Sequence, residues 1–167
     1  MNISTTSDVS TASQSTSTVA RLARQLLATS DSLGSTVARV ALGAMILPHG
    51  AQKLLGWFGG YGFEGTMGFF TGTLGIPAVF AFLAIVAEFF GGIALLLGVG
   101  TRVAALGVGA VMGVASTLHW QHGFFMNWYG NQKGEGVEFF VLAIALALVA
   151  LLQGGGRFSI DRALTRN

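Results

Sequence analysis

The chain has 167 residues, of which 52% are hydrophobic and only 10% are charged, with 25 glycines, no cysteine and a net charge of +2. Charged residues make up about 25% of an ordinary soluble domain, so this composition argues against a water-soluble bundle and indicates an integral membrane protein. The lack of cysteine excludes disulfides and thiol catalysis, and the basic residues form no dense patch of the kind that binds nucleic acid.

Residues 1–34 are predicted to be a Ser/Thr-rich leader. Met1–Thr18 has no apolar periodicity and too little apolar surface to offset the entropy of ordering, so we expect it to be disordered. It does not resemble a signal peptide, because its arginines follow a long polar stretch. In Val19–Ala28, apolar residues recur at helical spacing. This pattern fits a short amphipathic helix on the membrane surface, and equally a solvated linker helix.

The remaining residues, 35–167, are predicted to form an all-α integral membrane four-helix bundle. Four apolar segments follow one another, separated by Gly-rich turns. At a helical rise of 1.5 Å per residue, the first three are about 31, 33 and 27 Å long and can cross a bilayer. The fourth is about 21 Å long and has to recruit Gly134–Glu138 to do so. In chain order the segments are Ser35–Leu55, Pro77–Gly98, Arg102–His119 and Phe139–Leu152.

Basic residues orient these spans, because cytoplasmic flanks retain Lys and Arg. Four alternating spans place all seven arginines on one side and only Lys53 and Lys133 on the other, so both termini are expected to be cytoplasmic. The long connections Gly56–Ile76 and Trp120–Gly136 then lie outside, and the aromatic stretch that begins at Phe63 is expected to insert halfway and cap the outer mouth. The expected outer aromatic belt consists of Trp57, Tyr61, Trp120, Trp128 and Tyr129.

The first span contains polar residues that are unusual for a lipid-facing helix. Pro48 is expected to kink it. His49, Gln52 and Lys53 follow at spacings of three and four, so they share one face, which in a membrane normally points into the bundle or a wet cavity. An extended Lys53 that reaches the outer surface is the alternative, and Arg39 is expected to reach the inner surface in that way.

Glu88 interrupts an uncharged stretch near the middle of the second span. A carboxylate at this depth costs at least about 2.5 kcal/mol, so it should be protonated, paired or in contact with water, and we expect it to be largely neutral. Ala84, Gly91 and Gly92 are expected to leave space beside it. The pattern predicts an outward-opening polar pocket with Glu88 at its floor and His49 on its wall, and these two residues are the predicted catalytic pair.

Three further residues near the outer ends of the last two spans are predicted to complete the ligand-binding set. They are His119, His122 and Glu138. For the two histidines, which flank Trp120, a purely interfacial position is the alternative. Ala105, Gly109 and Gly113, spaced by four, are expected to let another helix approach the third span closely.

The sequence resembles the DoxX family of small four-span bacterial membrane proteins over roughly Val37–Leu164. The resemblance depends on RVALGAMILPHGAQKLLGW with its HG-x-QK motif, on LGIPA, on AEFFGGIALLLGVGTRVAALG, on the GFF after His122 and on the closing GRFSIDRAL. Glu138 stands where the family often has a glutamate. The resemblance implies a multi-pass protein of the bacterial inner membrane, often described as an oxidoreductase, with some members associated with thiosulfate:quinone oxidoreductase.

The leading functional hypothesis is a quinone-interacting redox subunit. A quinone headgroup needs hydrogen-bond donors for its carbonyls and a proton carrier, which His49, Gln52 and Glu88 could supply. The chain has neither a dinucleotide-binding loop nor cysteine for an iron–sulfur cluster, so electrons would come from a partner subunit. The alternative is a non-catalytic scaffold or carrier that binds a lipid or small solute. Haem or metal ligation by His49 with His119 or His122 lacks a tight ligand spacing, so no metal, haem or dinucleotide is expected. Self-association remains open.

Overall fold

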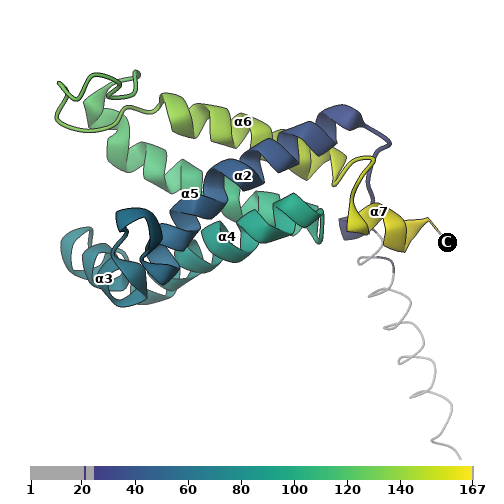
Figure 1. Cartoon of the computed structure of the whole chain (residues 1–167), viewed down its shortest axis with the longest axis horizontal. Helices are drawn as coiled ribbons and strands as arrows, with labels where there is room; N and C mark the ends of the chain where they lie inside the picture. The colour runs from purple at the N-terminus through teal and green to yellow at the C-terminus, as the bar shows by residue number, and fades with distance from the viewer. Residues whose placement is uncertain (1–20, 22–24, 167) are drawn as a thin grey trace, which may run out of the picture.

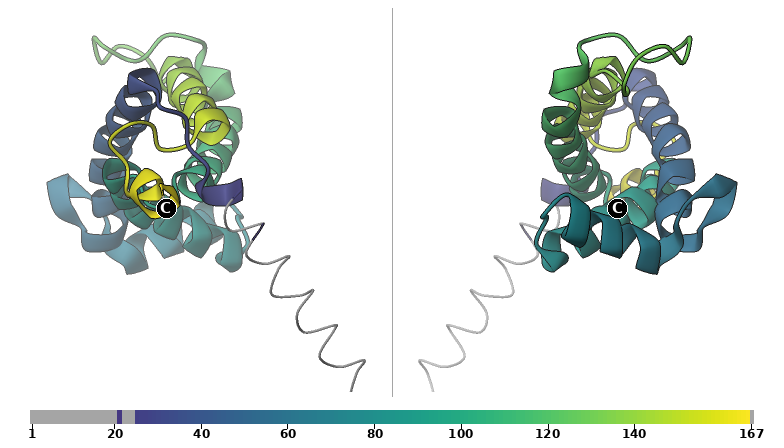
Figure 2. Two further views of the ribbon diagram at one scale, coloured as in Figure 1. Left: turned by 90° about the vertical axis from the view of Figure 1, so that its right-hand side faces the viewer. Right: turned by 90° about the vertical axis from the view of Figure 1, so that its left-hand side faces the viewer.

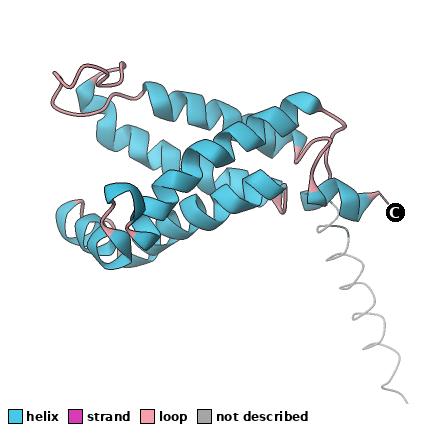
Figure 3. Ribbon diagram, viewed as in Figure 1, coloured by secondary structure: helices cyan, strands magenta, loops and turns pink. Residues whose placement is uncertain are grey.

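The computed structural model describes residue 21 and residues 25–166, and every regular element in this part of the chain is helical (Figure 3). The all-α prediction is confirmed for these residues. The predicted disordered leader lies outside the described residues, as does most of the predicted amphipathic helix, of which residue 21 and residues 25–27 are helical.

Four long helices form the body of the structure, and their ends are joined by short helices and loops (Figure 1). Along the chain, α2 contacts α4, α4 contacts α5, α5 contacts α6, and α6 returns to α2, so that the four helices surround a common axis (Figure 2). The long helices are α2 (Leu33–Leu55), α4 (Ala78–Leu97), α5 (Thr101–His119) and α6 (Glu138–Gln153). The short ones are η1 (Trp57–Gly59), α3 (Gly62–Gly68), the π-helix η2 (Phe69–Thr73), η3 (Trp120–His122) and α7 (Ile160–Thr165).

The two ends of the molecule differ. At one end, here called the loop end, lie α3 and the connection between α5 and α6; α7 lies at the opposite end, here called the α7 end (Figure 1). The segment that begins at Phe63 forms α3 and η2, neither long enough to cross a bilayer. Its predicted position at one mouth of the bundle therefore agrees with the arrangement of the helices.

Local sequence explains most helix boundaries. α2 begins after Ser32, whose Oγ accepts a hydrogen bond from the Ser35 amide at 3.2 Å, and it runs through Pro48 to Gly56, where φ is +73°. The prediction for the fourth span is wrong at its start, because residues 134–137 are not helical. Instead the Val137 and Glu138 amides donate to carbonyls of residues 123 and 124, which holds this segment in the loop.

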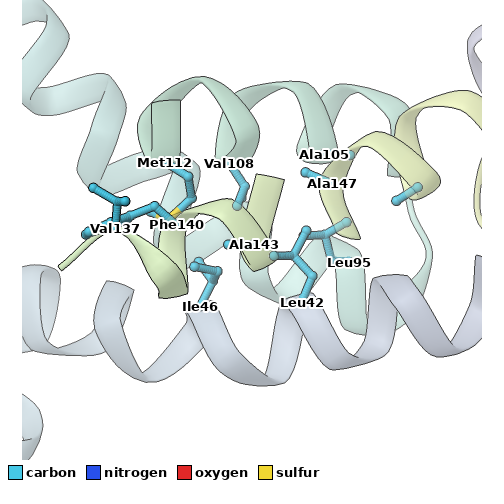
Figure 4. Close-up of a cluster of buried hydrophobic side chains, with 11 residues drawn as sticks. Leu42, Ile46, Leu95, Ala105, Val108, Met112, Val137, Phe140, Ala143 and Ala147 are labelled. Carbon is cyan, nitrogen blue, oxygen red and sulfur yellow. The ribbon is translucent and has the colours of Figure 1, made fainter. Parts of the chain in front are cut away.

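Eleven buried apolar side chains from the long helices and the α5–α6 connection form the central core (Figure 4). Leu42 and Ile46 of α2 meet Leu95 of α4, Val108 of α5 and Ala143 of α6 there. The predicted close approach to the third span occurs at one position. A Cβ on Gly109 would lie 3.3 Å from the Ala147 Cβ of α6, whereas a Cβ on Gly113 would meet nothing within 4 Å.

Two segments in the described part of the chain are long and apolar enough to cross a membrane: α4, and α5 extended through η3 to His122. Only 28% and 17% of the residues in an apolar 18-residue stretch of each are buried, so they expose apolar side chains as lipid-facing helices do, unlike the core helices of a soluble protein. α2 does not meet the same criterion because it carries polar residues and two charges, and α6 has only 16 residues. The predicted four spans are thus supported for two helices.

Arg39 is buried at the α7 end, with 1% of its surface exposed, and does not extend to the surface as expected. Its guanidinium donates to the carbonyls of Leu95 and Leu96 at 2.6 and 2.8 Å, to that of Gly155 at 2.6 Å, and to that of Phe158. The last carbonyls of a helix have no partner within it, so they attract a buried donor with several N–H groups. The same arginine thereby joins α4 to the chain that follows α6.

Two carboxylates complete the polar contacts at this end. The buried Asp161 side chain accepts hydrogen bonds from the Gly100 and Thr101 amides at 2.7 and 2.8 Å, which caps the start of α5. Asp31, on the surface, pairs with Arg162 and Arg157. Hydrogen bonds from Arg162 and then Arg157 hold the pKa of the Asp31 carboxyl well below its usual value.

Replacing Arg39 should destabilise the fold, because Arg39→Met leaves four buried or partly buried carbonyls without their donor. We expect the free energy of unfolding in detergent to fall by at least about 3 kcal/mol, measured by denaturant titration. Arg166→Met, at an exposed position near the C-terminus, is the control and should change it by less than about 0.5 kcal/mol. Equal stability of the two variants would contradict a structural role for Arg39.

Candidate ligand-binding site

The site begins where α2 crosses α4, and glycines allow the two backbones to meet. A Cβ on Gly50 would lie 2.5 Å from the Phe89 amide nitrogen, and one on Gly43 would lie 2.9 Å from the Gly92 carbonyl oxygen. Both distances are shorter than real Cβ contacts, so only glycine fits at this crossing. Ala84, Gly91 and Gly92 were expected to leave space beside Glu88, and Ala84 and Gly91 do line a cavity together with it, whereas the expectation is wrong for Gly92. Gly92 packs on Leu47 of α2, and a Cβ on Gly91 would meet a methyl group of α5 at 3.2 Å.

The crossing brings together two opposite charges. Lys53 lies one helical turn beyond Gly50, and its Nζ is 2.5 Å from Oε2 of Glu88. The Lys53 side chain is 25% exposed and that of Glu88 only 3%. Lys53 therefore pairs with Glu88 and does not extend to the outer surface. Glu88 is not an isolated carboxylate, which removes the reason for expecting it to be neutral, since a cationic partner offsets much of the cost of burying a carboxylate.

A cavity of about 1190 Å³ lies beside this pair. It runs along α4 and α5, and residues of α2, η2, α6 and the α5–α6 connection complete its wall. Ligand sites for drug-sized molecules occupy about 300–1,000 Å³, so this cavity has room for a headgroup with an attached chain. It is mainly apolar, in contrast to the predicted polar pocket. The lining side chains that can ionise are His49, Lys53, Glu88, His119 and Glu135; the six lining phenylalanines are Phe69, Phe70, Phe80, Phe90, Phe139 and Phe140.

The long edge of the cavity faces the apolar flank of the molecule. Phe80 and Phe90 of α4, and Val103 and Leu118 of α5, line the cavity and are also exposed on the surface. These are the two helices that are apolar enough to cross a membrane. The cavity is thus accessible from the side of the protein that would face lipid.

Four of the seven predicted site residues line this cavity. The His49 ring packs edge-on against Phe139 with 5.5 Å between ring centroids. The His119 ring lies 4.9 Å from that of Phe140, and its Nδ1 is 3.0 Å from the Glu135 carbonyl oxygen. Together with Lys53 and Glu88, these histidines supply imidazole, ammonium and carboxylate groups to one apolar space.

The other three predicted residues are not part of the cavity lining, although Gln52 approaches His49 and the His122 ring lies 5.9 Å from that of His119. Gln52 donates to the Phe58 carbonyl at 3.3 Å, in the turn after α2. Glu138 accepts a hydrogen bond from the Met126 amide at 3.1 Å and so holds the α5–α6 connection in place. His122 packs against Gly134, and its Nδ1 has no hydrogen-bond partner among the described residues. None of these side chains lines the cavity.

Sequence reasoning missed two features of the site. Lys53 was not recognised as the partner of Glu88. Away from the α7 end, however, α2 carries one basic residue, Lys53, and α4 carries one acidic residue, Glu88. Charge complementarity could have found this pair. Glu135, an exposed residue of the α5–α6 connection, also lines the cavity beside His119 and was not among the predicted site residues. No sequence signal places it there, because the loop conformation decides its position.

Comparison with known families gives one match. A sequence profile of the DoxX family matches residues 34–121, just over half of the chain. The chain belongs to the DoxX family. The matched region includes α2, α4, α5 and the Lys53–Glu88 pair, and it ends before α6. No curated protein and no solved structure matches the chain. DoxX membership and the two apolar helices together indicate a membrane protein.

The α2–α4 crossing predicts the effect of one methyl group in this DoxX chain. Gly50→Ala would press a Cβ against the α4 backbone, push the helices apart and lengthen the Lys53–Glu88 contact. Overpacking of this kind costs about 1–3 kcal/mol, which denaturant titration in detergent would measure. Gly113→Ala is the matched control, since it adds the same group to open space, and should be neutral or stabilising by up to about 1 kcal/mol. Gly50→Ala with wild-type stability would contradict the close crossing.

Proposed function

We propose that this DoxX protein binds a lipid-soluble quinone in the cavity and acts as the quinone-binding subunit of a membrane redox system. The observation that carries the proposal is the position of the Lys53–Glu88 pair on the wall of a large, otherwise apolar cavity. A quinone combines a carbonyl-bearing ring with a long apolar chain. The charged pair and His49 suit the ring, and the phenylalanine-rich wall suits the chain.

The residues of the cavity suit the proton chemistry of such a ligand. Reduction of a quinone to a quinol consumes two electrons and two protons. Lys53 can donate a hydrogen bond to a carbonyl oxygen, and His49 can exchange a proton with it. The chain lacks cysteine and a dinucleotide-binding loop, so we assign the supply of electrons to a partner redox subunit.

The proposed topology has four spans in the bacterial inner membrane, with the loop end outside and both termini cytoplasmic. At 1.5 Å per residue α2 is about 35 Å long and α6 about 24 Å, so α6 spans only if the bilayer thins or adjacent residues complete it. The arginines at the α7 end and the exposed tryptophans at the loop end support this orientation.

A carrier or scaffold that holds a lipid without redox chemistry is the second candidate. The mainly apolar lining favours it, because an acyl chain would fill the same space. The two candidates differ in what the charged pair does. A redox-silent lipid that contacts only apolar side chains accepts no hydrogen bond from Lys53, whereas a quinone carbonyl can accept one.

Binding measurements test the quinone proposal. Calorimetric titration with a decyl-substituted benzoquinone should show weaker binding for His49→Ala and for Glu88→Gln, each by roughly five-fold to over a hundred-fold. The double variant should lose less than the sum, because both residues serve one ligand. Lys133→Met, at an exposed loop position that does not line the cavity, should bind like wild type. Unchanged affinity in both single variants, with the fold intact, would favour the carrier.

Cysteine labelling tests the topology, since the chain has no native cysteine. Single cysteines at Asn131 in the α5–α6 connection and at Leu164 in α7 occupy exposed positions. In intact cells an impermeant maleimide should label Asn131→Cys and spare Leu164→Cys until the membrane is opened. The reverse pattern would invert the proposed orientation.

A further inference from the structure

The ion pair engages only one of the two oxygens of the Glu88 carboxylate. Oε2 contacts Nζ of Lys53 at 2.5 Å, whereas Oε1 accepts no hydrogen bond from any described residue. Oε1 is not one of the fully buried, unpartnered polar atoms of the described chain, so it opens onto the cavity that Glu88 lines. A ligand in the cavity can therefore donate a hydrogen bond to it.

Lys53 places hydrogen-bond donors directly beside this free acceptor. An ammonium group has three N–H donors, and the contact with Oε2 takes one of them. Lys53 also lines the cavity, with 25% of its side chain exposed. Because both oxygens of Glu88 belong to one carboxylate, a single ligand atom can lie within reach of Oε1 and of the free N–H groups. This position suits an atom that donates and accepts at once, as a hydroxyl oxygen does.

Further acceptors line the loop end of the cavity. Nδ1 of His119 lies 3.0 Å from the Glu135 carbonyl oxygen, which can only accept, so Nδ1 carries the proton and Nε2 of the neutral ring is an acceptor. The Glu135 carboxylate accepts from the Asn127 amide at 2.8 Å through Oε2, and its Oε1 has no partner among the described residues. Both residues line the cavity. A ligand with two hydroxyl groups can thus donate at either place.

We propose that the cavity recognises a hydroxyl-bearing headgroup and, within the quinone couple, binds the quinol more tightly than the quinone. This inference deepens the proposed quinone function and depends on it. One quinol oxygen accepts a hydrogen bond from Lys53 and donates its own hydrogen to Oε1 of Glu88. Glu88 then contacts the ligand in addition to pairing with Lys53.

The preference follows from what each form of the ligand offers to Glu88. A quinol O–H gives Oε1 a charge-assisted hydrogen bond. A quinone has only acceptors, so it can accept from Lys53 but displaces water from Oε1 and leaves that oxygen unpaired. A site that hydrogen-bonds a hydroxyl discriminates strongly against an analogue without one, so the quinol should bind at least about tenfold tighter. For a two-electron couple, each tenfold preference for the reduced form raises the midpoint potential of the bound ligand by about 30 mV.

The test compares three probes on the full-length protein in detergent. They are a decyl-substituted benzoquinone, its chemically prepared quinol and the dimethyl ether of that quinol, each titrated by calorimetry under argon. The quinol should bind at least about tenfold tighter than either of the other two. The ether keeps the ring, the chain and both oxygens but has no O–H donor, so it isolates the hydrogen bond to Glu88 from the redox state of the ring.

Variants test whether Glu88 is the acceptor. Both forms lose affinity when Lys53 loses its partner, so the readout is the ratio of the quinone to the quinol dissociation constant. In Glu88→Gln a neutral amide replaces the carboxylate, and the ratio should fall to within about threefold of one. Glu64→Gln, at an exposed position of α3 outside the cavity, is the matched control and should keep the wild-type ratio.

A wild-type ratio in Glu88→Gln would overturn the assignment of Glu88 as the residue that contacts the hydroxyl. Should this variant fail to fold with an unpaired Lys53, the neutral double variant Lys53→Met/Glu88→Gln replaces it, with the same expected ratio near one.

The outcomes separate this inference from the proposed function. Equal affinity for quinone and quinol in wild type, or a preference for the quinone, overturns the hydroxyl site and leaves quinone binding in place. A dimethyl ether that binds as tightly as the quinol overturns it as well, since the O–H group would then contribute nothing. Absence of binding for all three probes overturns the proposed function, and the inference with it.

Discussion

A buried charge in an apolar protein must have a partner, and the contact of α2 with α4 supplies one to Glu88. Gly50 allows the α4 backbone to lie where a side chain would otherwise be. The next turn of α2 then places Lys53 beside the Glu88 carboxylate. The crossing, the ion pair and the cavity wall form one unit. A change that separates the helices removes the pair, and without the pair the cavity loses its main polar feature.

The polar side chains at the two ends of the molecule differ in what they contact. At the α7 end, Arg39 and Asp161 are buried and bonded to backbone groups of α4, α5 and the segment after α6. These contacts leave little that a ligand could engage, and they hold the helices in place. Toward the loop end, Lys53 and His49 retain surface along the cavity. Ligand chemistry is therefore expected in that half of the protein.

Composition and periodicity predicted the all-α fold, and the position of Glu88 in a long apolar segment was enough to mark that residue as important. The surroundings of Glu88 were less predictable. Gly92 could be read as open space or as a packing surface, because the rotation of α2 against α4 decides between them. Gln52 shares a helical face with Lys53, yet it bonds to the turn after α2. The orientation of the Glu138 side chain depends on its hydrogen bond to the α5–α6 connection. The conformation of that connection depends in turn on hydrogen bonds between residues distant in sequence.

The central claim is that the cavity beside the Lys53–Glu88 pair holds a lipid-soluble quinone. Native mass spectrometry of the protein extracted in mild detergent, followed by release and identification of bound molecules, tests it most directly. The account predicts a quinone bound to wild type and lost from Lys53→Met/Glu88→Gln, with Lys133→Met retaining it. A redox-silent lipid bound equally to all three proteins, with no quinone, would contradict the account.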